Sequence, residues 1–231
     1  MTALDLLTPA GGQTNSNGRF YGVAIGIVTD NKDPQGLARV KVKFPWFSEK
    51  DTSSWARIVM PMTGKERGIY CLPDLDDEVL VAFSFGDIND PYIIGSLWNG
   101  KDKPPETNSD GKNNRRLIKS RSGHTVIFDD TEGAEKIIIR DKTENNEIII
   151  DSSTNTMTLK AEQDIAIEAK GSISLKSSGG DIAIAGKNIN LKAEQNCQIE
   201  ATAQCKLQAN SGLSIKCLAG VKINDGALEV M

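Results

Sequence analysis

Few residues of this chain are of the types that catalyse reactions or bind metals. His124 is the only histidine, and no neighbouring residue suggests a partner for general-base catalysis. The four cysteines, at positions 71, 197, 205 and 217, form no Cys-x-x-Cys pair of the kind found in zinc and redox sites. An acidic cluster precedes a β-patterned run and is expected in a solvated turn; it comprises Asp74, Asp76, Asp77 and Glu78. The sequence therefore predicts no catalytic residue, no metal site and no cofactor.

Composition indicates what kind of scaffold carries these residues. The 231 residues have a formal net charge of −4, which provides no overall attraction to nucleic acid. No apolar run approaches the roughly 18 residues of a membrane-spanning helix, and the N-terminus lacks the features of a signal peptide. We therefore expect synthesis and assembly in the cytoplasm. The three Trp, three Tyr and six Phe residues all lie at or before position 128, which predicts two parts with different packing.

The first part, residues 18–100, follows an N-terminal extension, residues 1–17, and alternates short β-patterned runs with turns. In one run the basic residues 39, 41 and 43 alternate with the apolar residues 40, 42 and 44, as in a half-buried antiparallel strand. Five strands are expected, at residues 20–28, 38–44, 55–60, 78–85 and 92–98. Short strands without helical periodicity indicate a small Greek-key barrel of the OB-fold class.

Several segments of this part resemble the OB domain of VgrG and phage baseplate spike proteins. They are GIVTDNKDPQGLARVKVKFPW at 26–46, WAR at 55–57, GIY at 68–70, PDLDDEV at 73–79, GDINDP at 86–91 and IGSLWNGKD at 94–102. The matching segments occur in order through most of the predicted barrel. The resemblance implies a structural role in a contractile injection system and no enzymatic activity.

An OB-fold also allows a nucleic-acid or glycan-binding module, which is the alternative function. Single-strand binding requires exposed aromatic rings along a basic groove. Candidates for these rings and charges are Phe44, Trp46, Phe47, Trp55, Arg39, Lys41 and Lys43. We favour packing in the core and collar for the rings, and a solvated face for the basic residues, because the chain is acidic overall.

A polar linker, residues 101–116, is expected to connect the two parts, since it contains two prolines and no apolar periodicity. Four basic residues close to its end form a possible phosphate-binding or membrane-binding patch: Arg115, Arg116, Lys119 and Arg121. Four charges make a weak patch. We therefore expect a strand whose basic groups face water.

The second part, residues 117–231, contains an internal repeat with a period of eight residues. Apolar residues recur as pairs two apart, which places both members on one face of a strand. The pairs are Ile148 with Ile150, Met157 with Leu159, Ile165 with Ile167, Ile173 with Leu175, Ile182 with Ile184, Ile189 with Leu191, Cys197 with Ile199, Cys205 with Leu207, Leu213 with Ile215 and Val221 with Ile223. Upstream, the pairs Val126 with Phe128 and Ile137 with Ile139 continue the pattern with a step of eleven.

An eight-residue unit is too short for a full coil of a single-chain solenoid, so each unit is expected to form one short arm. An arm needs neighbouring strands on both sides, because its backbone donors and acceptors are otherwise unpaired. Three identical chains wound around one axis supply these neighbours and bury the apolar pairs at the axis, as the core of the trimer. The predicted fold class is therefore all-β: an OB-fold barrel followed by an intertwined triangular β-helix formed by three chains.

This architecture also resembles that of the spike family. The resemblance implies a membrane-puncturing needle, with a baseplate hub protein, tube and effector proteins, and a PAAR-like tip protein as partners, and transient membrane contact on firing. The tip protein is expected to bind Gly226, Ala227, Leu228, Glu229, Val230 and Met231. Few residues precede the barrel, so the chain resembles a phage-type spike or a VgrG without its hub region.

Two alternatives concern the repeat. Cys197 and Cys205 take inward positions and are expected to pack as small hydrophobic residues; a threefold ring of thiolates around a soft metal is the alternative. A β-helical carbohydrate-active enzyme is the other alternative. The repeat has none of the long loops that such an enzyme uses to build a cleft.

Overall fold

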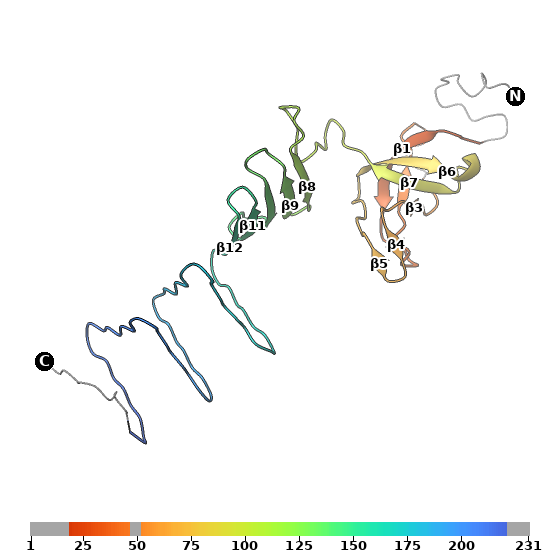
Figure 1. Cartoon of the computed structure of the whole chain (residues 1–231). Coiled ribbons are helices and arrows are strands. Elements are labelled where there is room, and N and C mark those ends of the chain that lie inside the picture. Colours follow the sequence, from red (N-terminus) through yellow and green to blue (C-terminus); the bar gives the residue numbers. More distant parts are fainter. Residues whose placement is uncertain (1–18, 47–51, 221–231) are drawn as a thin grey trace. The chain divides into compact units, whose positions relative to one another are not determined.

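The computed structural model describes residues 19–46 and 52–220. These residues form β-strands and one 3-10 turn, η2 (Ser84–Gly86), and no α-helix occurs among them. Within the described ranges, no helix of the length and hydrophobicity needed to cross a membrane is found. The chain divides into two compact units, Met1–Ile165 and Ala166–Met231, and each is described by itself. The first unit contains two separate five-stranded sheets (Figure 1).

The first sheet has the strand order β2-β1-β6-β7-β3 and curls into an OB-like barrel. Its neighbours pair antiparallel except for β3 and β7, which are parallel. Reciprocal backbone hydrogen bonds of 2.8 and 3.1 Å between Val40 and Ala56 connect the β2 side to the β3 side. The strands are β1 (Val23–Asp30), β2 (Lys41–Lys43), β3 (Arg57–Ile58), β6 (Glu78–Phe83) and β7 (Pro91–Ser96).

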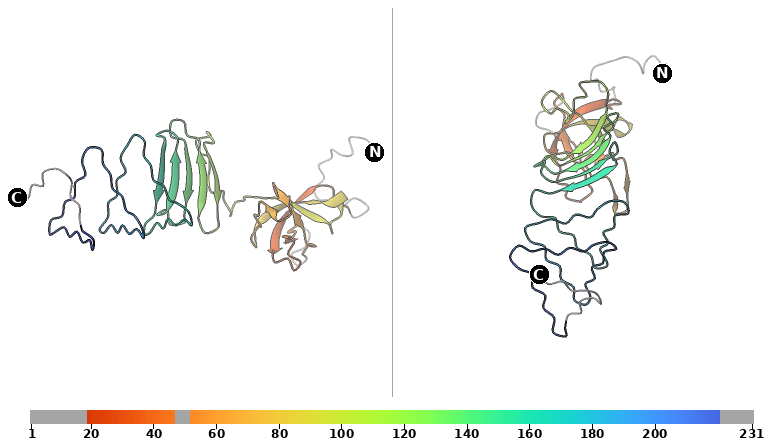
Figure 2. Two further views of the ribbon diagram at one scale, coloured as in Figure 1. Left: turned by 60° about the horizontal axis from the view of Figure 1, so that its bottom comes forward. Right: turned by 60° about the vertical axis from the view of Figure 1, so that its left-hand side comes forward.

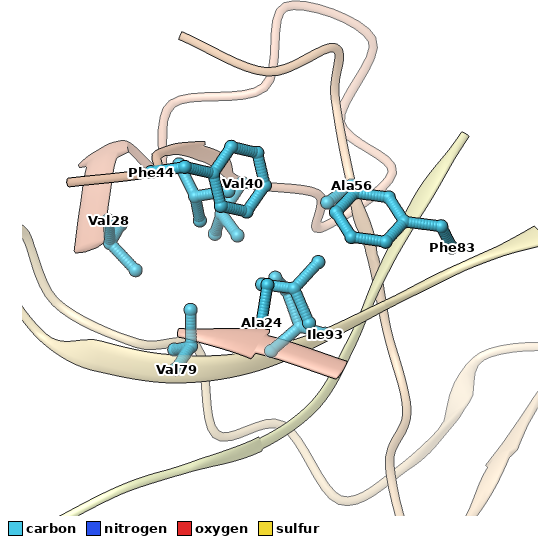
Figure 3. Close-up of a cluster of buried hydrophobic side chains, with 10 residues drawn as sticks. Ala24, Val28, Val40, Phe44, Ala56, Val79, Phe83 and Ile93 are labelled. Atoms are coloured by element: carbon cyan, nitrogen blue, oxygen red, sulfur yellow. The ribbon is translucent and has the colours of Figure 1, made fainter. Parts of the chain in front are cut away.

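The barrel core consists of the inward-facing residues of these strands. Along β6 buried and half-buried residues alternate, as expected for a strand with one face in a core. Gly26 is required for close packing, because a Cβ atom there would lie 3.1 Å from Val81 and 3.2 Å from Val42. The buried cluster, shown in Figure 3, comprises Ala24, Val28, Val40, Val42, Phe44, Ala56, Val79, Val81, Phe83 and Ile93.

The five runs expected to be strands correspond to the five strands of this sheet, with shifted ends. The run at 78–85 ends earlier because Phe85 has a φ of 47° and starts a tight turn with Gly86. The hairpin of β4 (Thr63–Gly64) and β5 (Arg67–Gly68) was not expected from the sequence. It is short and has no alternating apolar pattern, which explains why periodicity gave no signal there.

The second sheet of the first unit is an antiparallel meander with the order β12-β11-β10-β9-β8, formed entirely within one chain (Figure 2). Every pair of neighbouring strands is in register over five residues. The strands are β8 (Arg115–Lys119), β9 (Thr125–Asp129), β10 (Lys136–Arg140), β11 (Glu147–Asp151) and β12 (Thr156–Lys160). We call this element the meander sheet.

An aspartate begins three of the four turns of the meander sheet. Asp129, Asp141 and Asp151 each accept hydrogen bonds from a Thr or Ser hydroxyl two residues later, at 2.6 to 2.9 Å. Asp129 and Asp151 also accept a hydrogen bond from the backbone amide of that residue. Such side-chain to backbone bonds stabilise a chain reversal. The sequence Asp-x-Thr/Ser therefore marks the positions where this sheet folds back on itself.

Residues 161–220 are extended and bend at regular intervals. Bends fall at 162–163, 170–171, 178–180, 187, 194–195, 202–203, 210–211 and 218–219, so the backbone repeats with the eight-residue period of the sequence. The extended runs between them are 164–169, 172–177, 181–186, 188–193, 196–201, 204–209 and 212–217, which we call the arms. In Figure 1 the chain runs out along one arm, returns along a second, crosses along a third and then repeats this course.

The meander sheet differs from the expectation that the neighbours of every repeat unit come from other chains. Ile148 and Ile150 lie in β11, whose neighbours β10 and β12 belong to the same chain, and Met157 and Leu159 lie in β12 beside β11. The reason is the length and chemistry of the connections. The turns of this sheet have four to six residues and are stabilised by aspartate, whereas the bends between arms have at most three residues.

Candidate functional site

The residues considered for chemistry have structural roles or are exposed. The Nδ1 atom of His124 accepts a hydrogen bond of 3.2 Å from the Lys142 amide, which connects two turns of the meander sheet. In the acidic cluster, the carboxylate of Asp77 accepts a hydrogen bond of 2.8 Å from the backbone amide of Asp74. All four cysteines are exposed, free thiols. No group of three or more possible metal ligands is found within residues 19–46 and 52–220.

The rings and charges of the possible OB binding surface interact with one another. Phe44 is buried, and Trp46 stacks on Phe20 at 5.5 Å between ring centroids. Arg39 forms a bidentate ion pair with Asp33 at 2.8 Å, which lowers the pKa of that carboxyl well below its usual range. Arg39 and Lys41 also lie over the Trp55 ring, at 5.9 and 5.1 Å from its centroid. Phe47 lies outside the described residues.

The basic residues at the end of the linker and just beyond it are largely paired with acidic residues. Arg115 pairs with Glu106 at 2.8 Å and lies 3.8 Å from Asp129, and Arg116 pairs with Asp130. Arg121 pairs with Asp74 at 2.9 Å. This pairing leaves little net positive charge in the cluster and does not favour a binding site for phosphate or for a membrane surface.

One face of the meander sheet is apolar and has no cover within the sheet. Cross-strand pairing places two rows of apolar side chains on this face, and Arg116, at the β8 end of one row, is the only charged member. The large hydrophobic residues that are exposed there, by 37% to 72%, are Ile118, Phe128, Ile137, Ile139, Ile148, Ile150, Met157 and Leu159. A groove of about 650 Å³ opens along the row from Ile118 to Leu159.

The opposite face of the meander sheet carries charged side chains that can remain in contact with water. Its central row, with Ile127 only 4% exposed, is flanked by rows of charged residues. Cross-strand ion pairs lie between Lys136 and Asp151 at 3.0 Å, and between Arg140 and Glu147 at 3.1 Å. Long charged side chains can cover apolar neighbours while their heads stay solvated. The outer face of the sheet is therefore covered by paired charged side chains, whereas the apolar face is exposed.

The residues of the arms that were expected in a trimer core are exposed, not buried, in the single chain. Cys197 and Cys205 are exposed, and the aliphatic residues are between 50% and 76% exposed. These aliphatic residues are Ile165, Ile167, Ile173, Leu175, Ile182, Ile184, Ile189, Leu191, Ile199, Leu207, Leu213 and Ile215. The physical reason is that, among the described residues, other segments leave the apolar faces of the arms largely uncovered, although Ile165 lines the groove of the meander sheet. Their burial stays a prediction that depends on other copies of the chain.

The backbone of the arms lacks partners as well. No strand and no backbone–backbone hydrogen bond is formed among residues 161–220. Unpaired backbone groups in a folded protein require partners, and exposed apolar surface of this extent marks an interaction site. The arms and the apolar face of the meander sheet are therefore two candidate assembly surfaces.

The last expected core pair and the expected tip-binding residues belong to the C-terminal segment after residue 220. Val221 and Ile223 lie outside the described residues. The expected tip-binding residues lie outside them too; they are Gly226, Ala227, Leu228, Glu229, Val230 and Met231. The roles of all these residues stay predictions.

The turn aspartates of the meander sheet are held ionised. The side-chain bonds from Asn146 and Thr143 lower the pKa of Asp141 to about 2. Hydrogen bonds from the Thr131 hydroxyl lower the pKa of Asp129, and those from Ser153 and Lys136 lower the pKa of Asp151. A carboxylate that accepts several hydrogen bonds is favoured in its charged form.

The apolar pairs are evident from the sequence, but the turn aspartates and the cross-strand ion pairs were not predicted from it. The Asp-x-Thr/Ser repeat at 129, 141 and 151 was the available signal for the turns. The ion pairs had no such signal, because they join residues whose proximity depends on strand register.

Comparison with known proteins finds a family whose model matches the barrel. Residues 24–98 match the family described as Type VI secretion system/phage-baseplate injector OB domain. These residues include every strand of the first sheet except the first residue of β1. The OB-like connectivity of the barrel agrees with this match.

Larger relatives extend the similarity beyond the barrel. The type VI secretion system spike protein VgrG3 of Vibrio cholerae is 28% identical over 140 residues, covering 57% of this chain and 14% of that protein. The spike protein VgrG1a of Pseudomonas aeruginosa is 29% identical over 127 residues, covering 50% of this chain and 20% of that protein. The actin cross-linking toxin VgrG1 of Vibrio cholerae is 29% identical over 109 residues, covering 44% of this chain and 10% of that protein.

The chain thus spans at most a fifth of the length of these relatives. Its barrel matches the model of the injector OB domain, and the similarity to the spike proteins covers about half of the chain. Through this region the chain is similar to VgrG and phage-baseplate spike proteins.

Proposed function

We propose that this chain is a structural spike, the membrane-puncturing needle at the baseplate centre of a contractile injection system, and that it acts as a homotrimer without enzymatic activity. The observation that carries the proposal is the state of residues 161–220. They are extended, bend every eight residues, expose an apolar pair in every arm and have no backbone pairing of their own. Such a segment is stable only when other strands lie beside it.

Three copies of the chain would supply the neighbouring strands that these arms lack. If each arm turns by a third of a full turn and climbs one strand spacing of about 4.8 Å, one chain leaves room for two others between its successive turns. The arms of the neighbouring copies then complete the backbone hydrogen bonds. The aliphatic pairs meet at the axis, where they exclude water. The course of the chain in Figures 1 and 2 supports this arrangement.

The meander sheet is expected to join the same trimer in a different way. Each copy contributes one complete sheet, and the three apolar faces, with their grooves, pack against one another around the axis. The charged outer faces remain in water, where their cross-strand pairs are already formed. Burial of the exposed Ile, Met, Leu and Phe side chains provides the driving force.

The function that follows is mechanical. A prism with a dry core and a continuous ladder of inter-chain hydrogen bonds resists bending, because each strand is held on both edges. Contraction of a sheath would drive such a prism through a membrane. Similarity to the spike proteins supports a hub protein and tube or effector proteins as partners of the barrel end, with a PAAR-like protein at the other end.

The oligomeric state tests the proposal directly. Three chains of 25.0 kDa give a particle of about 75 kDa in multi-angle light scattering. We expect this trimer to resist SDS until it is boiled, and the amides of 166–220 to be protected from hydrogen exchange. A folded monomer with protected amides in that region would overturn the proposal.

The tip contact is tested by a deletion. We expect removal of residues 225–231 to abolish binding of a PAAR-like protein and to leave the trimer intact, as measured by pull-down and light scattering. Equal capture of the PAAR-like protein by the shortened and full-length chains would place the contact elsewhere.

The alternative function, an OB-fold module for nucleic acid or glycan, is less favoured. Arg39 is engaged by Asp33 and Lys41 by Trp55, so two of the three basic residues of the possible binding face already have partners in the chain. Titration with a labelled oligonucleotide at low salt separates the two functions. Salt-sensitive binding that is lost when Trp55 is changed to Ala would favour the module.

A further inference from the structure

The repeated arms raise the question of what sets the register between copies. Because successive arms carry nearly the same apolar pairs, a copy displaced by one arm along the axis would still bury them. A strand whose apolar pattern fits several alignments is prone to slippage unless another feature selects one. The candidates are the side chains on the outer face of the arms.

One outer position carries a regular series of charges. The fifth residues of the seven six-residue arms are, in order, Glu168, Lys176, Ala185, Lys192, Glu200, Gln208 and Lys216. Alternation along an extended arm places these residues opposite to the apolar pair. No two neighbouring arms carry the same charge at this position, and two neighbouring pairs have opposite charges: Glu168 with Lys176, and Lys192 with Glu200.

These charges have no ion-pair partner in their own chain within residues 52–220. In the proposed trimer, which this inference presupposes, the strand next to an arm on the same side of the prism is the following arm of a neighbouring copy. Equivalent positions of parallel neighbours then lie about one strand spacing, 4.8 Å, apart. Glu168 of one copy therefore lies beside Lys176 of the next, and Lys192 beside Glu200.

We infer that these two ion pairs between copies, Glu168 with Lys176 and Lys192 with Glu200, select the register of the needle. A displacement of one arm in one direction brings identical residues together, so that Glu168, Lys176, Lys192 and Glu200 each face their own equivalents. A displacement in the other direction brings Lys176 against Lys192 and leaves one pair of opposite charges, Glu200 with Lys216, in place of two. Like charges directly opposite one another on neighbouring strands are destabilising.

The meander sheet supplies a precedent for this contact inside one chain. There, opposite charges on neighbouring strands pair across the face opposite to the apolar rows, at 3.0 Å for Lys136 and Asp151 and at 3.1 Å for Arg140 and Glu147. The arms repeat this pattern of an apolar inner face and opposite charges on neighbouring strands of the outer face. Their neighbouring strands, however, would come from other copies.

Zero-length cross-linking tests the contact in the full chain. Light and nitrogen-15-labelled chains are refolded together and treated with a carbodiimide, which joins a carboxylate to an amine in direct contact. We expect a cross-linked peptide that joins Glu168 to Lys176 and contains one light and one heavy half. A trimer that gives only singly labelled cross-links, or none between these residues, would overturn the register contact but not the trimer. A monomeric parental chain would overturn both.

Exchange of the charges provides a second test. We expect Lys176→Glu and Glu168→Lys each to lower the temperature at which the SDS-resistant trimer dissociates at low salt, and the double exchange to restore it. Lys206→Glu is the matched control, because its neighbours at the same position of adjacent arms are Gln198 and Ser214. We expect sodium chloride to reduce the differences in dissociation temperature between these variants and the parental chain. Equal dissociation temperatures for Lys176→Glu and Lys206→Glu, or no restoration in the double variant, would contradict the inference.

Discussion

The meander sheet and the arms differ in how their backbone groups are paired, although the sequence patterns of their apolar faces are nearly alike. Both carry apolar residues two apart, and both leave these residues exposed in the single chain. The meander sheet pairs its backbone within the chain over five strands, whereas the arms pair no backbone groups among the described residues. The first can therefore fold before it meets another copy, and the second cannot.

The difference suggests an order of assembly. A preformed sheet loses little conformational entropy when it docks, because its backbone is already fixed. In the proposed trimer the arms would lose theirs only when the three chains wind together. Docking of the meander sheets would bring the chains together before the arms pair, and the charges of the arms would then select their register. This order predicts that damage to the arms and damage to the sheet have different consequences.

The largest effect is expected in the arms. In the proposed trimer, changing Ile173 or Ile182 to Asp would place three carboxylates around one axial layer, which we expect to cost at least about 3 kcal/mol per chain and to prevent trimer formation. Ser174→Asp, on the outer face of the same arm as Ile173, should leave the mass in light scattering unchanged. Equal tolerance at positions 173 and 174 would contradict the assignment of inner and outer faces.

A smaller and different effect is expected in the meander sheet. Ile139→Asp places a charge on its apolar face and should weaken docking of the sheets, while the strands of each sheet keep their own hydrogen bonds. Hydrogen exchange measured by mass spectrometry should therefore show protected amides in residues 115–160 and fast exchange in 166–220.

The control for this variant is Thr158→Asp, on the outer face of β12. It should retain protection in both regions. Simultaneous loss of protection in the sheet and in the arms of Ile139→Asp would show that the sheet does not fold independently.

The turn aspartates allow a test by pH. The pKa of Asp141 in the folded chain is about 2, below its ordinary value of 3.8. A depressed pKa contributes stability above the ordinary value, and this stability is lost as pH falls toward about 2. We expect the thermal midpoint of the sheet to decrease over this range, and the decrease to be smaller in Asp141→Ala.

Asp164→Ala serves as the matched control, since Asp164 lies in an arm and accepts no hydrogen bond among the described residues. At neutral pH Asp141→Ala should lower the midpoint and Asp164→Ala should not. The same pH dependence in Asp141→Ala as in the parental chain would assign the acid sensitivity to other groups.

The smallest effect is expected at His124. His124→Ala removes the acceptor of the Lys142 amide, and the exchange of that amide should become faster. Trimer mass and the protection of residues 166–220 should remain unchanged. A change in the oligomeric state would indicate a role for His124 beyond the connection of two turns.

Much of the fold could be predicted from the sequence because the relevant signals are local. Alternation at residues 38–44 identified a strand of the barrel, and the apolar pairs identified the period of the arms. The five barrel strands have the expected order along the chain. The hairpin at Thr63–Gly68 escaped prediction because its two-residue strands have no periodicity to detect.

The sequence by itself determined which face of each strand is apolar and how often the chain bends, since side-chain direction alternates along any extended chain. Only the tertiary structure decided which strand lies beside which. Ile148 and Ile150 have the same spacing as Ile173 and Leu175, yet the first pair lies in a sheet closed within the chain and the second lies in an arm without a neighbour among the described residues. The physical reason is that backbone hydrogen bonds carry no side-chain signature. Their partners are selected by the turns, where Asp141 and its hydrogen bonds reverse the chain and the short bends of the arms do not.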